Sequence, residues 1–285
     1  MTFIFFAALC SVAVSIVLKQ FKQRDYSALQ MIVWNYVTAS LLCWFWFKPD
    51  FAHLSIHDTP WWLIGMLGVL LPSIFFCLAK SLQYAGIIKT EVAQRLSVVL
   101  SLLAAYFVFH EQFSSLKLLG VALGITAVLS LIVAKTQATT QTQSSKAGWF
   151  LASVWAGYAL VDILLKYNSS LGQQFALSLN LMFMVAGVAS AIFVSLSKLE
   201  QWQVKNLTAG VLLGVLNFAN IAFYVQAHQL LKDAPAVVFV VMNVSVVTLG
   251  VLSGLIYFKE KPNQMTMIGL LLSLIGVGCL AMSMT

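Results

Sequence analysis

Three polar residues lie close together inside an apolar stretch of this chain. Glu91, Gln94 and Arg95 are spaced i, i+3 and i+4, so on a helix they share one face and Glu91 can pair with Arg95. Ionisable groups within a membrane are costly and usually face a cavity or a partner. We therefore predict the polar lining of a binding cavity, with Arg95 contacting an anionic group and Glu91 as its partner or a proton carrier. An ion pair that only joins helices would give the same pattern.

Other polar and aromatic residues of the apolar stretches are predicted to complete this cavity. An excess of basic groups over Glu91 favours an anionic or zwitterionic substrate. Glu91 and His228 are the candidates for coupling transport to protons, His228 because imidazole titrates near neutral pH. Helix-joining hydrogen bonds or core packing would explain each asparagine or tryptophan as well. The further residues predicted to bind substrate are Trp34, Lys80, Trp155, Asn217, Asn220, Tyr224, His228 and Asn243.

The chain lacks the motifs that would indicate an enzyme or a metal site. No GxxxxGK[ST] loop is present, which excludes ATP hydrolysis as the driving force, and there is no HExxH or GxSxG motif. His53 and His57 have HxxxH spacing in a polar loop, which is weak evidence for a metal site. The cysteines lie in apolar stretches without CxxC spacing. We expect no enzyme activity, no metal and no cofactor.

The composition is that of a membrane protein. Of 285 residues, 61% are hydrophobic and 9% are charged, whereas soluble domains carry about 25% charged residues. We predict an all-α protein with ten transmembrane helices, because stretches of about 20 apolar residues recur along the chain. The net charge of +7 then reports on topology and not on nucleic-acid binding. The predicted spans are 2–20, 29–47, 61–84, 87–108, 116–134, 147–166, 174–196, 208–230, 235–258 and 265–283.

The second half of the chain repeats the first. Glu111 and Glu260, which are 149 residues apart, end equivalent apolar stretches, and Gly120 and Gly269 follow them at the same spacing. We predict two five-helix repeats, 1–134 and 147–285, joined by a polar linker at 135–146. Because five is odd, the repeats must cross the membrane in opposite directions, an arrangement typical of transporters.

The two copies differ at the predicted cavity. Glu91 corresponds to Val240 and Arg95 to Val244, whereas Gln94 retains an amide counterpart in Asn243. The repeat symmetry indicates the class of transport mechanism, and the positions at which the two copies differ indicate where the binding site lies. A second feature is structural: Gly120 and Gly269 each begin a small-xxx-small pattern that favours close helix packing, within the bundle or in a dimer.

Four further charged groups near span ends are predicted to be architectural. Asp162 and Lys166 are spaced i, i+4 and predict an ion pair near the end of the sixth span. Glu111 and Glu260 are predicted to cap or clamp the adjoining loops, because charge near an interface is inexpensive.

The ends of the fourth and ninth spans resemble a known transporter family. FVFHE at 107–111 is followed by Leu-Gly at 119–120, and YFKE at 257–260 is followed by Ile-Gly at 268–269. With the lysines that close the first and sixth spans, Lys19 and Lys166, this pattern resembles the ten-helix EamA type of the drug/metabolite transporter superfamily. The resemblance covers essentially the whole chain and implies movement of small metabolites across a bacterial inner membrane.

Two features depart from that family. Members usually have glycine before the glutamate, where this chain has His110 and Lys259. The resemblance also implies that both termini face the cytoplasm, whereas the basic residues of the loops lie mainly on the side that would leave both termini outside. The orientation in the membrane therefore stays open.

These observations predict a secondary transporter that moves a small polar or amphipathic metabolite by alternating access, with export of an amino acid or related compound as one specific form of this function. Its expected partners are the lipid bilayer and a small-molecule substrate, and we expect a monomer or a weak homodimer. A receptor-like membrane interaction protein is the alternative, and a membrane-embedded enzyme is a more distant one.

Overall fold

The computed structural model describes residues 1–51, 59–109, 113–134, 141–197, 202–231 and 234–283. Within these ranges the chain forms helices and no strands. The elements are α1 (Thr2–Gln23), α2 (Ala28–Phe47), α3 (Trp61–Tyr84), α4 (Ile87–Arg95), α5 (Ser97–Phe109), α6 (Ser115–Val133), α7 (Gln141–Ser170), α8 (Phe175–Ser197), α9 (Val204–Leu230), α10 (Pro235–Leu252), the π-helical η1 (Ser253–Tyr257) and α11 (Gln264–Met282).

The helices confirm the predicted all-α membrane fold, with two differences at element boundaries. In the described part of the chain, nine segments are long and apolar enough to cross a membrane. The predicted span 87–108 is instead divided into α4 and α5, which are separated at Leu96. In addition, α7 begins at Gln141, within the segment 135–146 that was predicted as a linker.

Local sequence signals account for several helix starts. The side chains of Ser27, Ser114 and Asn263 accept hydrogen bonds from backbone N–H groups three residues later, at 3.3, 3.3 and 2.8 Å. Such caps satisfy donors that have no partner within the helix. Pro235 is the first residue of α10, where the absence of an N–H has no cost.

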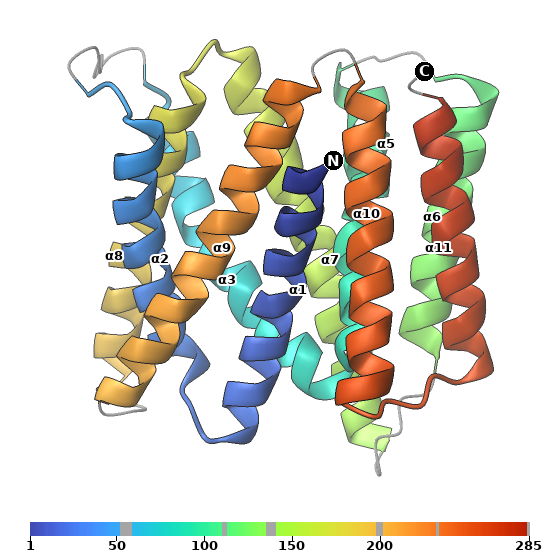
Figure 1. Ribbon diagram of the computed structural model, residues 1–285, viewed down its shortest axis with the longest axis horizontal. Helices are drawn as coiled ribbons and strands as arrows, with labels where there is room; N and C mark the ends of the chain where they lie inside the picture. Colours follow the sequence, from blue (N-terminus) through green and yellow to red (C-terminus); the bar gives the residue numbers. More distant parts are fainter. Residues whose placement is uncertain (52–58, 110–112, 135–140, 198–201, 232–233, 284–285) are drawn as a thin grey trace.

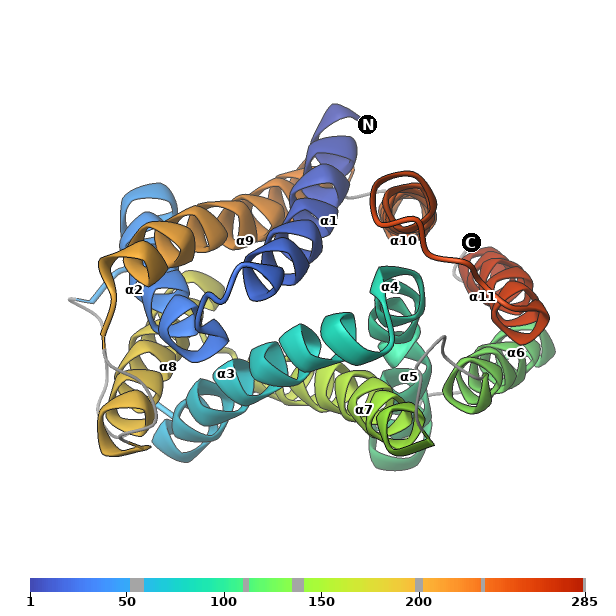
Figure 2. The same ribbon diagram turned by 90° about the horizontal axis from the view of Figure 1, so that it is seen from below.

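The two halves of the chain run through the bundle in opposite directions. Figure 1 shows the two termini toward the same end, with α1 descending from that end while its repeat equivalent α7 ascends toward it. The seen-from-below view in Figure 2 places α1 and α9 on one side of the centre and α3 and α7 on the other. In that view α6 and α11 form a pair at one end of the molecule. This is the arrangement expected of inverted repeats.

Glycines allow helices of different repeats to approach closely. A Cβ at Gly214 of α9 would lie 2.7 Å from the backbone oxygen of Asn35 in α2. In the α6–α11 pair, a Cβ at Gly120 would lie 3.1 Å from the backbone oxygen of Gly276, and one at Gly269 would lie 2.7 Å from Ser130 Oγ. The small residues at 120 and 269 therefore serve packing within the bundle.

The contacts of the two repeats are not equivalent. Helix α1 packs against α3 and α4. Among the described residues, the corresponding pairs, α7 with α9 and α7 with α10, do not pack to a comparable extent. The two repeats thus contain equivalent helices, but these helices make different contacts in each repeat.

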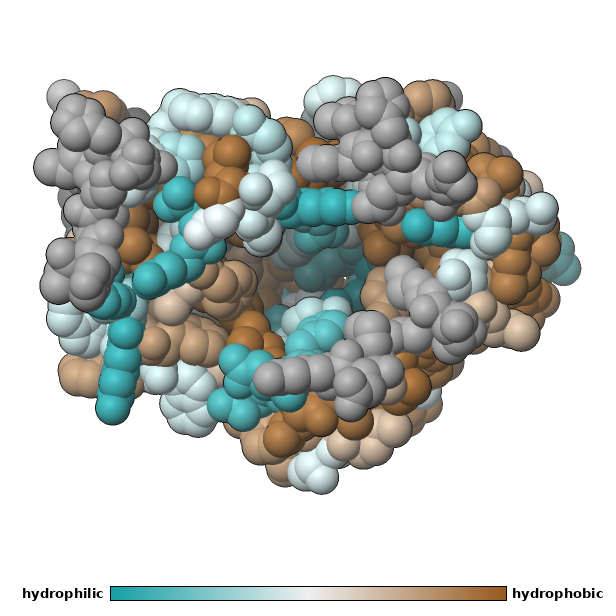
Figure 3. Space-filling model, turned by 90° about the horizontal axis from the view of Figure 1, so that it is seen from above, coloured by the Kyte–Doolittle hydropathy of each residue, from teal (hydrophilic) through white to brown (hydrophobic). Residues whose placement is uncertain are grey.

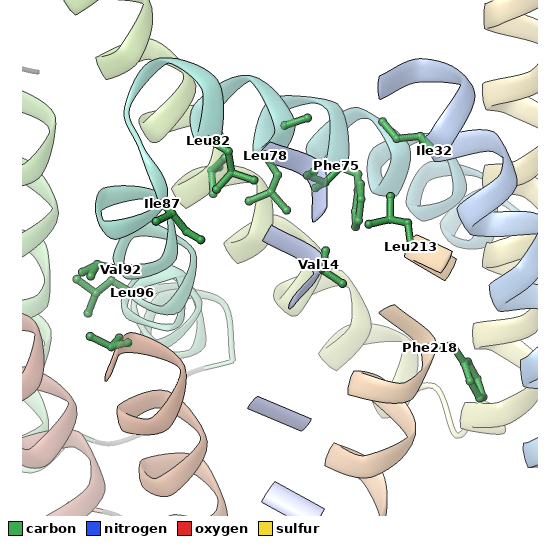
Figure 4. Close-up of a cluster of buried hydrophobic side chains, with 14 of the residues drawn as sticks. Val14, Ile32, Phe75, Leu78, Leu82, Ile87, Val92, Leu96, Leu213 and Phe218 are labelled. Carbon is green, nitrogen blue, oxygen red and sulfur yellow. The ribbon is translucent and has the colours of Figure 1, made fainter. Parts of the chain in front are cut away.

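The apolar core extends across both repeats. Figure 4 shows side chains of α1, α2, α3, α4 and α9 that belong to one buried cluster, including Val14, Phe75 and Leu213. Many large apolar side chains are instead exposed on the outside, among them Trp44, Trp62 and other aromatic residues near helix ends. Such a surface is suited to lipid, and aromatic residues at span ends are typical of the membrane interface.

Candidate functional site

The bundle is hollow at the end toward which its termini lie. Figure 3, seen from above in the frame of Figure 1, shows a depression in the middle of the molecule with hydrophilic residues inside it. Polar groups within a membrane bundle usually face such a cavity. The groups that surround Arg95 are the candidates for its functional lining.

Arg95 takes its position from the break between α4 and α5. The backbone oxygen of Leu96 accepts a hydrogen bond from Val99 N at 3.0 Å and from Trp155 Nε1 of α7 at 2.9 Å. Non-helical backbone at membrane depth is tolerated where neighbouring protein groups satisfy it. Trp155, predicted to bind substrate, therefore uses its polar atom to hold the helix break.

Arg95 is the last residue of α4 and stands at the centre of a polar cluster. Its Nη2 donates a hydrogen bond to Ser11 Oγ of α1, whereas its buried Nε has no protein acceptor. The charge of Arg95 lies within electrostatic range of Tyr158 and Asp162 in α7 and of Tyr224 in α9. Groups from three other helices are thus gathered around the guanidinium of α4.

Asp162 belongs to this cluster, although the sequence suggested a different role. Its carboxylate accepts a hydrogen bond from Ser101 Oγ of α5 at 3.3 Å, in place of the expected ion pair with Lys166. The reason is that α5 packs against α7 and brings a hydroxyl to the carboxylate. Asp162 is exposed even though it interacts with both Arg95 and Tyr224, which is consistent with a position facing the hollow.

Lys166 lies one turn further along α7 and lines a different cavity. This cavity has a volume of about 150 Å³ and lies between α7 and α8, where Asn168 and Ser178 also contribute to its walls. The i, i+4 spacing of Asp162 and Lys166 thus does not bring them into one ion pair.

Glu91 is buried on the face of α4 that meets α10. Only 1% of its surface is exposed, and neither carboxylate oxygen receives a hydrogen bond from the protein. Arg95, which the spacing suggested as a direct partner, donates to Ser11 instead. The two charges share a helix without forming the predicted pair, because α4 ends at Arg95 and its side chain extends toward α1.

Glu260 caps the first turn of α4 from the other repeat. Its carboxylate accepts hydrogen bonds from the backbone N–H groups of Ile87 at 2.7 Å and Ile88 at 3.2 Å, and it forms a salt bridge with Lys19 of α1. Gly86, at a φ of +90°, permits this approach, because a Cβ there would lie 2.7 Å from Glu260 Oε1. The equivalent Glu111 lies outside the described residues.

The predicted asparagines are spread between helix contacts and the cluster. Asn217 Nδ2 donates to Asn35 Oδ1 at 3.2 Å and joins α9 to α2. Asn220 has a buried Oδ1 without a protein donor. Asn243 Nδ2 donates to the backbone oxygen of Phe239 at 2.8 Å, and Asn243 lines a crevice shared with Arg95.

The remaining predicted residues lie on α9, α3 and α4. Tyr224 contacts His228 edge-on, with ring centroids 4.7 Å apart, so these two lie together on α9. Lys80 places its Nζ 5.4 Å from the ring centroid of Phe76, one turn away on α3. Gln94 is half-buried on α4.

Trp34 lies at a helix contact outside the cluster. Its Cβ is against Gly210 of α9, and its ring is edge-on to that of Trp202 at 6.4 Å. These contacts indicate packing between α2 and α9.

Sequence reasoning missed two parts of the site. Asp162 was assigned to a local pair, although a carboxylate in an apolar span is itself a signal of function. Ser11 is a small hydroxyl among apolar neighbours on α1, and no sequence pattern distinguishes it from a packing residue.

Comparison with known proteins agrees with this architecture. The model of the EamA-like transporter family matches residues 1–133 and again 146–282, so each repeat matches separately. An uncharacterized protein of Haemophilus influenzae is 38% identical over 282 residues, which cover 96% of each chain. Together with the inverted bundle and its polar centre, these matches establish that the chain belongs to the EamA-like transporter family.

Proposed function

We propose that this protein is a secondary transporter of a small metabolite that carries a carboxylate, and that alternating access moves this substrate across a bacterial inner membrane. Amino acids and related zwitterions are the substrate class that the cluster fits best. The chain has no ATP-binding loop, so a gradient or exchange would drive the movement.

The observation that carries this proposal is the Arg95 cluster. Arg95 and Asp162 interact electrostatically, yet Asp162 is hydrogen-bonded to Ser101 and Arg95 to Ser11. Opposite charges held apart at the centre of a membrane bundle are unfavourable unless a ligand lies between them. A zwitterion would place its carboxylate at Arg95 and its ammonium group at Asp162, with Tyr158 and Tyr224 as walls.

Counterflow into proteoliposomes tests this function. Purified protein, loaded with a mixture of unlabelled L-α-amino acids, should exchange them for externally added labelled ones. Arg95→Gln should weaken uptake about 10- to 100-fold, because a hydrogen bond to a charged group contributes about 1.5–3 kcal/mol. Asp162→Asn should reduce uptake of the amino acids and have less effect on acids that lack the amino group.

Two results would contradict the proposal. If Arg95→Gln carried anionic and neutral probes as well as the parent does, Arg95 would not contact the substrate. If no metabolite pool gave counterflow while the protein copurified with a stable partner, a receptor-like role would replace transport. A thermal-shift screen against a metabolite library identifies the ligand, since binding to the folded state raises its stability.

A further inference from the structure

Glu91 occupies a place where an ionised carboxylate is strongly unfavourable. Its side chain is 1% exposed, and no protein donor meets hydrogen-bond geometry at either oxygen, although the Ser15 hydroxyl and the Arg95 guanidinium lie close enough to act on it. A buried charge without a partner in an apolar medium is usually neutralised, because the loss of hydration outweighs any weak interaction that remains. Burial of this kind favours the protonated acid in the conformation described here.

The carboxyl group is not required for packing at this position. A Cβ on Gly250 of α10 would lie 2.9 Å from Glu91 Cγ and 3.1 Å from its Cβ, so the stem of Glu91 fills the contact between α4 and α10. The equivalent residue of the second repeat is Val240. The fold thus accommodates an aliphatic residue at the same place in the other copy.

The neighbours of Glu91 leave one candidate counter-ion within a turn. On its own helix this is Arg95, and Ser15 of α1 adds an uncharged hydroxyl. Helix α7 contributes Tyr158 and, beyond it, Asp162, both of which also interact with Arg95. Helix α10 has no titratable side chain between 237 and 252. The remaining charges near the start of α4 are Lys89, which donates to the backbone oxygen of Ala134, and the Lys19–Glu260 salt bridge.

Arg95 is positioned to have two alternative partners. A glutamate four residues before an arginine can pair with it along a helix. In this conformation, however, the guanidinium extends toward Ser11 and interacts with Asp162, on the side of the proposed substrate. A guanidinium that pairs with ionised Glu91 would be less available to a substrate carboxylate.

We propose that Glu91 binds the proton that drives transport and that its protonation releases Arg95 for the substrate. This inference rests on the proposed transport function. A proton from water on the open side adds to the carboxylate, and the substrate then binds Arg95. On the other side the proton leaves to water, ionised Glu91 captures Arg95, and the substrate carboxylate is displaced. One proton and one substrate move in the same direction.

Accumulation in proteoliposomes under an imposed pH gradient tests this coupling. The membrane potential is clamped, and the probe is the labelled L-α-amino-acid mixture. With the interior more alkaline by one pH unit, one proton per substrate should concentrate the probe about tenfold inside, because one pH unit is a factor of ten in proton activity. Glu91→Gln should give an inside-to-outside ratio of about one, and Glu91→Val, which copies Val240, serves as the second variant.

Each outcome separates the coupling from the function. Counterflow by the parent without any response to the gradient would overturn the role of Glu91 and leave transport intact. Accumulation only when the interior is more acidic would also overturn it, because that result indicates exchange. Absence of counterflow in the parent would instead contradict the proposed function.

The proton itself can be observed without a substrate. The infrared spectrum of the reconstituted protein at neutral pH should contain the carbonyl band of a protonated, buried carboxylic acid. Glu91→Gln should remove this band, and Asp162→Asn should retain it. A parent spectrum without a band that depends on Glu91 would overturn the proposal.

Discussion

At the scale of residues, the site contains polar groups that lie near other polar groups but lack some of their hydrogen-bond partners. Arg95 retains a buried Nε without a protein acceptor, and Glu91 has two oxygens without a donor. Hydrogen bonds across membrane helices contribute only about 0.6 kcal/mol on average. The unpaired atoms of these groups are therefore better explained by the binding of a ligand or a proton than by a contribution to stability.

The hydrogen bond from Trp155 to the helix break leads to a prediction about stability. Trp155→Phe keeps the aromatic volume and removes the donor to Leu96 O, so the protein should lose about 1 kcal/mol of unfolding free energy. The measurement is thermal or denaturant unfolding in detergent. Trp149→Phe on the exposed side of α7 is the matched control. Equal stability of both variants would show that the bond does not hold the break.

The sequence identified the polar residues of the site more successfully than it identified their hydrogen-bond partners. Glu91, Arg95 and Tyr224 are identifiable because polar groups are conspicuous in an apolar span. Their pairing is not, since the partners of Asp162 and Arg95 are Ser101 and Ser11, which lie on other helices. Local spacing suggested pairs along one helix, and tertiary contacts gave different ones.

At the scale of elements, the contacts between repeats depend on individual glycines. Gly65 and Gly214 are repeat equivalents, yet their surroundings differ. A Cβ at Gly214 would lie 2.7 Å from a backbone oxygen and 2.6 Å from Thr38 Cβ, whereas one at Gly65 would have nothing within 4 Å. The same residue type therefore has different structural importance in the two copies.

This difference predicts opposite effects of the same substitution. Gly214→Ala should destabilise the protein by about 1–3 kcal/mol, because α9 must move away from α2. Gly65→Ala should be neutral or stabilising by up to about 1 kcal/mol, since alanine is the better helix former. Unfolding midpoints in detergent compare the two variants directly. Comparable losses in both would show that the α2–α9 approach is not limiting.

Comparison of the predicted spans with the observed helices shows why most helices were predicted and the break at Leu96 was not. Long apolar stretches locate most helices within a few residues. Leu96 follows the polar residues Gln94 and Arg95, but the segment 87–108 contains no glycine or proline that would predict a helix break there. The break exists because α7 offers Trp155 to the freed carbonyl, and that contact is tertiary.

At the scale of the whole molecule, basic residues distinguish the two ends. Lys22, Arg24, Lys205 and Lys261 lie near the ends of helices opposite to the termini, together with the salt-bridged Lys19. The end that carries the termini has Lys48, directly after α2, and Lys117, in the first turn of α6. Basic loops of bacterial membrane proteins face the cytoplasm.

We therefore predict that both termini lie outside the cytoplasm. Alkaline phosphatase fused after Thr285 should be active in a bacterial host, and a fluorescent protein fused there should be dark. The same reporters fused in the connection between α8 and α9 should give the reverse pattern. Fluorescence of the C-terminal fusion would support the cytoplasmic placement that the family resemblance implies.

The unequal contacts of α1 and α7 have a consequence for the shape of the molecule. Helix α1 packs against α3, and Leu18 and Leu82, near the lysine-rich ends of these helices, belong to one buried cluster, while α7 and α9 do not pack comparably in the described chain. If each half adopted the internal arrangement of the other, α7 would meet α9 and α1 would withdraw from α3. The resulting body would be hollow at the lysine-rich end. The arrangement of helices within each half therefore predicts the arrangement that the other half adopts in the opposite conformation.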